Sequence, residues 1–398
     1  MPIEIALIGA GTMGSGIAQL ALEHGHPVRL IDLDPAARTL ARATIEERLA
    51  RRLARRGLSG AELDGTLAET LGRLTIGADP AEAAGAPVVI ETIVEILAVK
   101  QALFARLDEI TPDETILATN TSALSVAAIA EAAARHPTRV VGLHFFNPAP
   151  VMPLVEVIAC PGTDPGVVAA VAALVASWGR TPIRSADRPG FVVNRINRAF
   201  TIQALRQLEA GQAGIARIDA AVRAGGFPLG PFELMDLIGI DVNLAAATGI
   251  WEGFGRAARF RPSPIQERLV AAGRLGRKAG QGFYRYDLAG GPLGPAPEFE
   301  STAERDGPLP NAAIVERIRL AIVNEAYRAL EEGVASDEAT IDLALRLGAG
   351  HPEGPFEWAH EWGAAEVRAR LASLAADDPD TFRPAASLRR SVETQPVR

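Results

Sequence analysis

The chain opens with a short apolar run that leads directly into a turn containing three glycines. Residues 3–8 predict a strand and residues 15–23 have the spacing of a helix. Gly9, Gly11 and Gly14 lie between them. In such a turn the first glycine permits a tight bend, the second lets the backbone approach a pyrophosphate, and the third lets helix and strand pack closely. This order of strand, turn and helix is typical of a doubly wound α/β sheet.

An acidic residue, Asp32, ends the next apolar run, residues 28–31. It stands at about the spacing expected of the residue that binds the ribose of a dinucleotide. Its carboxylate would accept hydrogen bonds from the ribose diol and repel a 2′-phosphate, and neither Arg29 nor Arg38 is placed to reverse that preference. The phosphates would meet the positive end of the helix. We therefore predict that NAD binds at the glycine turn and Asp32.

Further apolar runs alternate with helical segments up to about residue 187, at residues 87–90, 115–118, 139–145, 154–158 and 181–183. This alternation predicts a Rossmann-type, doubly wound and mostly parallel sheet. Residues 41–71 form an insertion whose spacing predicts two amphipathic helices. Its four clustered arginines form either a solvated helix face or a contact surface for an anionic ligand: Arg51, Arg52, Arg55 and Arg56.

The second half of the chain is helical and contains an internal repeat. Three motifs recur in order at a nearly constant offset: VNRI at 193–196 as VERI at 315–318, ID at 218–219 as ID at 341–342, and GPFE at 230–233 as GPFE at 354–357. Two such copies can pack together and bury the apolar faces that each would otherwise expose. We predict an NAD-binding domain (1–187), a first helical domain (188–287), a linker (288–310) and a second, degenerate helical repeat (311–398).

Composition excludes several classes of protein. The net charge of −8 argues against nucleic acid as a partner, because proteins that bind it collect positive charge. The single cysteine, Cys160, excludes a disulfide framework and a cysteine-based zinc cluster, and we predict no metal site. No window approaches the ~20 apolar residues of a membrane span, and the N-terminus lacks the pattern of a signal peptide. We expect a cytoplasmic protein without a membrane partner.

Five motifs from residue 120 onward carry a family resemblance: NTS at 120–122, HFFNP at 144–148, PLVEVI at 153–158, FVVNR at 191–195 and GRKAGQGFY at 276–284. Together they resemble the 3-hydroxyacyl-CoA dehydrogenase family over nearly the whole chain. The duplicated helical half is similar to the dehydrogenase portion of the multifunctional fatty-acid oxidation proteins. The resemblance implies reversible, NAD-dependent oxidation of an L-3-hydroxyacyl-CoA to a 3-ketoacyl-CoA.

That chemistry needs a base, because the hydroxyl proton must leave as hydride leaves the same carbon, and histidine is suited to this near neutral pH. His144 ends a predicted strand, where an open parallel sheet places its ligands. Glu156, on or near the next strand, could hydrogen-bond the imidazole and stabilise its charged form. We predict a catalytic His144–Glu156 pair and assign structural roles to the other five histidines.

The resemblance also assigns Ser122 and Asn194 to the substrate oxygen, where hydrogen-bond donors stabilise developing charge. The alternatives are a helix N-cap for Ser122 and a surface polar residue for Asn194. The repeat places Glu316 where the first copy has Asn194. The second copy is therefore predicted to lack the catalytic amide and to act as a packing partner.

The nicotinamide side of the cofactor is assigned by the resemblance to four residues: Glu95, Lys100, Asn120 and Asn147. Only two lysines occur in this arginine-rich chain, and Lys100 is one of them; its alternative is an exposed helix charge. The other, Lys278, belongs either to the structure of its loop or to a contact with the thioester ligand. One departure from the family is Ile96, which stands where most members have asparagine and which changes the hydrogen bonding near the cofactor.

The glycine turn and Asp32 would also suit two other functions. A dehydrogenase of a free hydroxy acid or carnitine usually has proline after the histidine, and Phe145-Phe146 disagrees. A non-catalytic NAD-binding scaffold would not need Ser122, His144, Glu156 and Asn194 together. A single helical domain in this family normally packs on its twin in a dimer, so the repeat predicts a monomer with pseudo-twofold helical domains, with a homodimer as the alternative.

Overall fold

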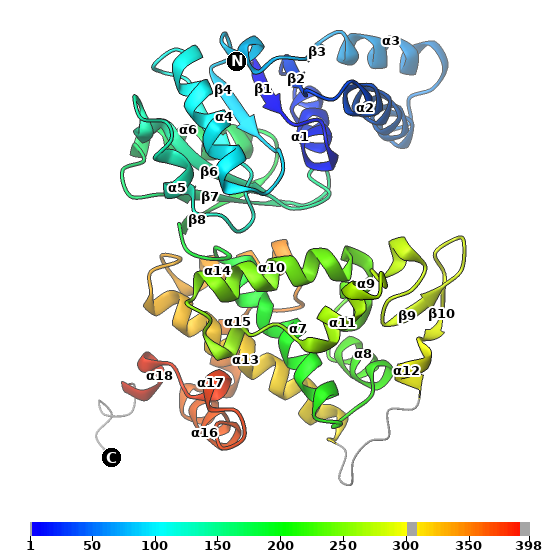
Figure 1. The fold of residues 1–398 in the computed structure, drawn as a ribbon, viewed down its shortest axis with the longest axis vertical. Helices are drawn as coiled ribbons and strands as arrows, with labels where there is room; N and C mark the ends of the chain where they lie inside the picture. Colours follow the sequence, from blue (N-terminus) through cyan, green and yellow to red (C-terminus); the bar gives the residue numbers. More distant parts are fainter. Residues whose placement is uncertain (1, 301–308, 391–398) are drawn as a thin grey trace. The chain divides into compact units, whose positions relative to one another are not determined.

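The computed structural model describes residues 2–300 and 309–390, so part of the predicted linker and the last eight residues lie outside the described residues. The chain divides into two compact units, Met1–Arg188 and Pro189–Arg398 (Figure 1). The first contains a sheet covered by helices, and the second is mainly helical. These are the two structural classes that the sequence predicts for the two halves.

The first unit is built on an eight-stranded sheet of order β3-β2-β1-β4-β5-β6-β7-β8. Its strands are β1 Ile5–Ile8, β2 Val28–Ile31, β3 Leu74–Gly77, β4 Val88–Glu91, β5 Ile116–Thr119, β6 Val140–Phe145, β7 Leu154–Ala159 and β8 Thr181–Ala186. Every pairing is parallel except that of β6 with β7. The strand order reverses between β1 and β4, and open sheets of this kind bind ligands beyond the carboxyl ends of the strands at such a point. The predicted Rossmann-type fold is confirmed.

Helices cover the sheet and account for the continuous apolar strands. They are α1 Thr12–Glu23, α2 Pro35–Arg55, α3 Gly60–Leu71, α4 Leu97–Ile110, α5 Val126–Ala130 and α6 Pro165–Ser177. All four residues of β1 are buried, as expected of a parallel strand covered on both faces. One core cluster joins Leu7 of β1 to Ile17 of α1, Ile45 of α2 and Val171 of α6.

Two features of this unit differ from the predictions. Strand β3 was not predicted, because only Leu74 and Gly77 of its four residues are buried and the segment contains no apolar run. The insertion does form two helices, but α2 begins at Pro35 rather than near residue 41, with Asp34 as its N-cap. Figure 1 shows α2 and α3 in blue beyond the β3 edge of the sheet.

The second unit contains two four-helix sets in the same order. The first is α7 Val193–Glu209, α8 Ile215–Ala224, α9 Pro231–Ile238 and α10 Ile240–Gly253. The second is α13 Asn311–Glu331, α14 Glu338–Ala349, α15 Pro355–Trp362 and α16 Ala364–Leu374. Between and after them lie α11 Pro264–Ala271, a hairpin of β9 Tyr284–Tyr286 and β10 Pro292–Pro295, α12 Pro297–Glu300, α17 Pro379–Phe382 and α18 Ala386–Arg390.

The predicted repeat extends to individual hydrogen bonds. The backbone N–H of Phe232 donates to Asp219 at 3.0 Å, and the corresponding N–H of Phe356 donates to Asp342 at 2.8 Å. A Cβ atom on Gly230 would lie 2.3 Å from Asp219, and one on Gly354 would lie 2.2 Å from the Asp342 side chain. Glycine is therefore required at the start of both α9 and α15. The two copies keep the same helix-to-helix connection.

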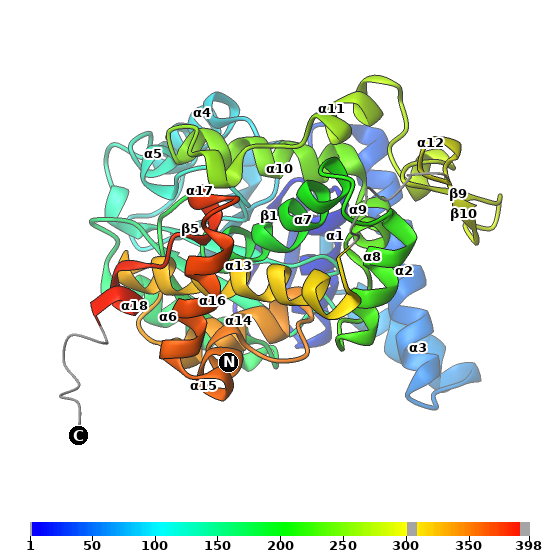
Figure 2. The ribbon, with the colours of Figure 1, turned by 90° about the horizontal axis from the view of Figure 1, so that it is seen from below.

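The two copies pack on each other through their first helices, α7 and α13 (Figures 1 and 2). The fully buried guanidinium of Arg195 on α7 donates to Glu325 on α13 at 2.8 Å and to Glu332 at 2.8 Å. Pairing of this kind is what allows a charged side chain to be buried. The copies thus cover each other within one chain, as the sequence predicts.

Within residues 2–300 and 309–390, no single helix is long and apolar enough to cross a membrane. The α9–α10 pair meets the length and composition requirement only when its two helices, which are bent by 101°, are taken together.

A buried histidine contributes to the contact between the copies. His351, which follows α14, lies 2.8 Å from Asn197 on α7 through its Nε2 atom. The rings of Phe227 and Trp358 pack against it, with centroids 5.2 and 6.0 Å away. Burial lowers the pKa of His351 to about 3. The folded protein therefore holds this imidazole in its neutral form.

This burial predicts a loss of stability in acid. Below pH ~6.5 the unfolded chain binds a proton that folded His351 cannot accept, so the free energy of unfolding falls by about 1.4 kcal/mol per pH unit. Denaturant unfolding at pH 7.5 and 5.5 should show a smaller loss for His351→Gln than for the wild type. His360→Gln, at an exposed histidine, is the control and should keep the wild-type loss. An identical loss in His351→Gln and the wild type would contradict this assignment.

Candidate active site

The glycine turn after β1 forms one wall of a cavity of about 570 Å³. Gly9 has a φ of +108°, and a Cβ atom there would lie 2.8 Å from the Thr92 carbonyl oxygen. A Cβ atom on Gly14 would lie 1.8 Å from the Gly9 carbonyl oxygen, whereas one on Gly11 would meet nothing within 4 Å. Gly9 and Gly14 are thus required by close packing, while Gly11 lines the cavity with open backbone.

Asp32 lines the same cavity from the end of β2. Its Oδ2 atom accepts a hydrogen bond from the backbone N–H of Ala10 at 2.7 Å, which ties the carboxylate to the glycine turn. Arg29 pairs with Glu4 at 3.0 Å, and Arg38 donates to the Asp32 carbonyl oxygen at 2.7 Å. An open backbone that can approach phosphates, with a carboxylate beside it, fits a dinucleotide with a free ribose diol.

His144 and Glu156 stand directly opposite each other on the antiparallel strands β6 and β7. The His144 Nδ1 atom lies 2.7 Å from Glu156 Oε2, and both side chains are buried. The ring of Phe146 packs against the imidazole, with centroids 4.6 Å apart. Because His144 Nδ1 is hydrogen-bonded to Glu156, Nε2 is the ring nitrogen that would exchange a proton with a substrate. The predicted contact is present, and the catalytic role remains a prediction.

Glu95 organises the loop after β5, which carries Ser122. It accepts hydrogen bonds from the Thr121 hydroxyl at 2.6 Å and from the backbone N–H of Ser122 at 2.8 Å. Burial acts to raise the pKa of Glu95, but the Lys100 ammonium and these hydrogen bonds outweigh it and lower that pKa. Ser125, rather than Ser122, caps the helix that follows. The interpretation of Ser122 as a helix cap is therefore wrong.

Lys100 is buried between two carboxylates, so its interpretation as an exposed helix charge is wrong. Its Nζ atom lies 2.6 Å from Glu91 and 3.2 Å from Glu95. Glu91, the last residue of β4, also accepts a hydrogen bond from the Thr119 hydroxyl at 2.7 Å. Burial raises the pKa of Glu91 even though Lys100 and Thr119 act to lower it. Glu91 was not predicted, because its only signal in the sequence is an acid at the carboxyl end of an apolar run.

The remaining predicted cofactor residues lie at the same edge of the sheet. The side-chain oxygen of Asn120, after β5, accepts a hydrogen bond from the backbone N–H of Phe145 at 2.8 Å. It thereby fixes the end of the strand that carries His144. Asn147 is exposed after β6, and its peptide bond to Pro148 is cis. Ile96 is also exposed, at the residue that precedes α4.

Two predicted residues lie in the second unit. Asn194 is the second residue of α7. Lys278 pairs with Asp241 of α10 at 2.6 Å. The loop that carries Lys278 is fastened by Asp236, which accepts hydrogen bonds from the backbone N–H groups of Phe283 and Tyr284 at 2.9 and 2.8 Å. These contacts favour a structural role for Lys278, and its ligand contact stays a prediction.

Two of the four arginines in the insertion contact other residues of the first unit, and the other two are exposed to solvent. Arg51 pairs with Glu47, while Arg52 lies 3.2 Å from Glu23 and donates to the Pro150 carbonyl oxygen at 3.1 Å. Arg55 and Arg56 are exposed. Both interpretations of this surface, a solvated helix face and an anion contact, therefore stay open.

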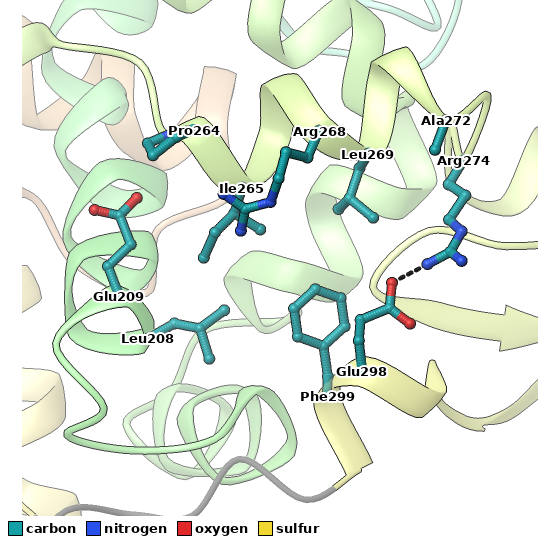
Figure 3. Close-up of a pocket in the computed structure, with 10 residues that line it drawn as sticks. All are labelled: Leu208, Glu209, Pro264, Ile265, Arg268, Leu269, Ala272, Arg274, Glu298 and Phe299. Carbon is teal, nitrogen blue, oxygen red and sulfur yellow. Dashed lines mark hydrogen bonds and ion pairs between the residues drawn. The ribbon is translucent and has the colours of Figure 1, made fainter.

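A larger cavity, of about 790 Å³, lies within the second unit (Figure 3). Cavity volume alone therefore does not identify the active site. The apolar lining of this larger cavity includes Leu208, Ile265 and Phe299, and Arg274 pairs with Glu298 at its rim. It lies at the end of α7 opposite Asn194 and contains none of the predicted site residues. Among the described residues, no group of three or more His, Cys, Asp or Glu side chains could hold a metal.

Comparison with known proteins shows the family. The family model described as 3-hydroxyacyl-CoA dehydrogenase, NAD binding domain, matches residues 4–188. The one described as 3-hydroxyacyl-CoA dehydrogenase, C-terminal domain, matches residues 190–286 and 314–397. The chain belongs to the 3-hydroxyacyl-CoA dehydrogenase family. The predicted family is confirmed, and the two C-terminal matches fall on the two copies of the repeat.

Individual relatives of this chain support the same family assignment. The chain is 37% identical to 3-hydroxyadipyl-CoA dehydrogenase of Escherichia coli (strain K12), over 97% of this chain and 96% of that protein. It is 38% identical to mitochondrial hydroxyacyl-coenzyme A dehydrogenase of Sus scrofa, over 71% of this chain and 91% of that protein. The crystal structure of 3-hydroxybutyryl-CoA dehydrogenase from Escherichia coli K12 substr. MG1655 superposes with a TM-score of 0.87 at 35% identity, covering 99% of both chains.

The buried Glu91–Lys100 pair predicts a specific pattern of stability. Glu91→Gln should lower the free energy of unfolding by about 3 kcal/mol, because it leaves a buried ammonium without its nearest counter-charge. The double variant Glu91→Leu with Lys100→Met should recover most of that loss, because it removes both charges. Glu69→Gln, at an exposed glutamate that pairs with the partly buried Arg73, is the control and should cost less than about 1 kcal/mol. Denaturant unfolding measures all three, and a Glu91→Gln variant as stable as the control would contradict the assignment.

Proposed function

We propose that this protein catalyses the reversible, NAD-dependent oxidation of an L-3-hydroxyacyl-CoA to the 3-ketoacyl-CoA. The observation that carries the proposal is the 2.7 Å contact between His144 and Glu156, in a member of the 3-hydroxyacyl-CoA dehydrogenase family. The glycine turn and His144 follow β1 and β6, three strands apart in the sheet. At about 4.8 Å per strand this separation is ~14 Å along one edge.

The residues of the first unit divide the chemistry among them. NAD, when bound, supplies the acceptor for the hydride. His144 Nε2 takes the hydroxyl proton from the substrate, and Glu156 at Nδ1 stabilises the imidazolium that forms and fixes the ring orientation. In the reverse direction His144 returns that proton to the oxygen. The family resemblance adds Ser122 and Asn194 as hydrogen-bond donors to this oxygen.

The residues at the glycine turn support NAD as the cofactor. Gly9, Gly11 and Gly14 are proposed to form the phosphate-binding turn, and Asp32 is proposed to bind the adenine ribose. Glu95, Lys100, Asn120 and Asn147 are proposed to act on the nicotinamide side. Of these, Glu95 and Lys100 are in direct contact, and Asn120 fixes the strand that carries His144.

We also propose that one chain supplies the helical packing for which a shorter family member uses a dimer. The support is the α7–α13 contact, where Arg195 pairs with Glu325 and Glu332 across the two copies. The acyl group is less determined, since one relative is named for a hydroxyadipyl substrate and another structure for a hydroxybutyryl substrate.

The central assignment is tested at His144. With acetoacetyl-CoA and NADH, His144→Gln should lower kcat at least about 100-fold, because it removes the general acid–base, while the affinity for NADH stays near the wild-type value. Absorbance of NADH measures turnover, and fluorescence titration measures binding. A wild-type rate in the variant would remove His144 from the mechanism. Absence of turnover by the folded wild type at any chain length would defeat the proposed function.

The choice of cofactor is tested at Asp32. Asp32→Ser removes the charge that would repel a 2′-phosphate, so kcat/KM should fall for NADH and rise for NADPH. We expect the ratio of the two to drop by about 10-fold or more. The variant Asp34→Ser removes a nearby carboxylate that caps α2, and it should leave the ratio unchanged. An unchanged ratio in Asp32→Ser would contradict the assignment.

A further inference from the structure

Arg198 is a buried arginine that follows Asn194 by four residues on α7. Residues separated by four lie on the same face of a helix, one turn and ~6 Å apart along its axis. The Arg198 side chain reaches α10 rather than solvent, and the residue is 7% exposed. A cation is thus held inside the second unit on the face of α7 that begins with Asn194.

No carboxylate pairs with Arg198 among the described residues. Its Nη1 atom contacts only Asn243 of α10, at 3.2 Å from the side-chain oxygen and 3.4 Å from the carbonyl oxygen. Its Nε atom has no hydrogen-bond partner. The other two buried arginines in the described part of the chain are both paired: Arg139 with Asp108 at 3.0 Å, and Arg195 with two glutamates.

An unpaired charge at such a site is unfavourable, because the guanidinium has given up water without gaining an anion. Burial lowers the pKa of Arg198 to about 10. The side chain therefore remains a cation at neutral pH. Buried charges are normally paired or hydrogen-bonded throughout. The combination of no carboxylate partner and an unpartnered Nε donor leaves Arg198 with the capacity to pair with an anion.

The second copy of the repeat serves as an internal control. The VNRI and VERI motifs are offset by 122 residues, which places Leu320 at the position of Arg198 and Glu316 at that of Asn194. Leu320 is 1% exposed, so this fold accepts a buried aliphatic side chain at the position. Glu316 pairs instead with Arg370 at 2.8 Å. Arginine thus occurs only in the copy that also has the asparagine predicted to bind the substrate.

We propose that Arg198 binds a carboxylate at the far end of the acyl group, so that the substrate class is a short dicarboxylic 3-hydroxyacyl thioester. The inference rests on the proposed function, because Asn194 marks where the substrate's C3 oxygen would bind. Arg198 lies one helical turn beyond Asn194. It would therefore meet the terminal carboxylate of an acyl chain that extends only a few methylene groups past C3. A guanidinium matches a carboxylate with two parallel hydrogen bonds.

Neighbouring amides hold the guanidinium for this role. Gln266 of α11 donates from its Nε2 atom to the side-chain oxygen of Asn243 at 2.9 Å. That oxygen is the one that contacts Arg198. Asn243 therefore presents an acceptor to one end of the guanidinium, while the buried Nε atom on its other edge has no hydrogen-bond partner. Both amides are themselves buried, so the arrangement is fixed before a ligand arrives.

The first test compares two substrates of equal length, 3-oxoadipyl-CoA and 3-oxohexanoyl-CoA, with NADH. The wild type should favour the carboxylated substrate in kcat/KM. Arg198→Leu, which installs the residue of the second copy, should lower the ratio of the two kcat/KM values by about 10- to 100-fold. Arg198→Lys should retain part of the preference. Equal losses on both substrates, or an unchanged ratio, would overturn the proposal.

The second test needs no turnover, so it separates this inference from the proposed function. Adipyl-CoA and hexanoyl-CoA lack the reactive oxygen and differ only in the terminal carboxylate. Calorimetry in the presence of NAD should show tighter binding of adipyl-CoA to the wild type, and Arg198→Leu should remove that difference. Arg268→Leu, at an exposed arginine of the same unit, is the control and should leave it intact. Equal affinity of the wild type for both thioesters would overturn the proposal, whatever the outcome of the turnover assays.

Discussion

The antiparallel pairing of β6 with β7 is the constraint on which the chemistry of this protein depends. Every other neighbouring pair in the sheet is parallel, and residues that face each other across parallel strands come from distant parts of the chain. Here a short connection reverses the chain and places Glu156 directly opposite His144. The buried glutamate has the imidazole as its partner, which makes its burial tolerable and holds the ring in one orientation. Around this pair, Asn120 fixes the end of β6, and Glu95 with Lys100 fixes the loop that carries Ser122.

The helical half shows how a duplicated domain divides its tasks. Both copies keep the aspartate that caps the GPFE helix, Asp219 in one and Asp342 in the other, because the connection between helices requires it. The second copy lacks the asparagine and the buried arginine of α7, and has Glu316 and Leu320 at those positions. Features that both copies share thus serve folding. Features found in one copy only, such as Arg198, are the candidates for contact with a ligand.

The sequence predicts those parts of the structure that have a local or repeated signal. The glycine turn, the long apolar strands and the repeat are read from spacing, whereas β3 is missed because it is half exposed. Glu91 could not be predicted from the sequence, because one acid at a strand end does not indicate that a lysine nine residues later will be buried against it. Arg198 could not be predicted for the same reason. An arginine on an amphipathic helix is expected in solvent, and only the packing of α10 and α11 shows that this one is buried. Family motifs identify His144, but the opposing position of Glu156 follows from strand register.

The central claim is that the His144 imidazole, held by Glu156, exchanges the proton of the substrate oxygen. A crystal structure of the protein with NAD and acetoacetyl-CoA measures this directly. We predict that His144 Nε2 lies within hydrogen-bonding distance of the substrate C3 oxygen, at about 2.6–3.2 Å, with Nδ1 still bonded to Glu156. A ring that stays beyond the reach of that oxygen in the complex would contradict the account.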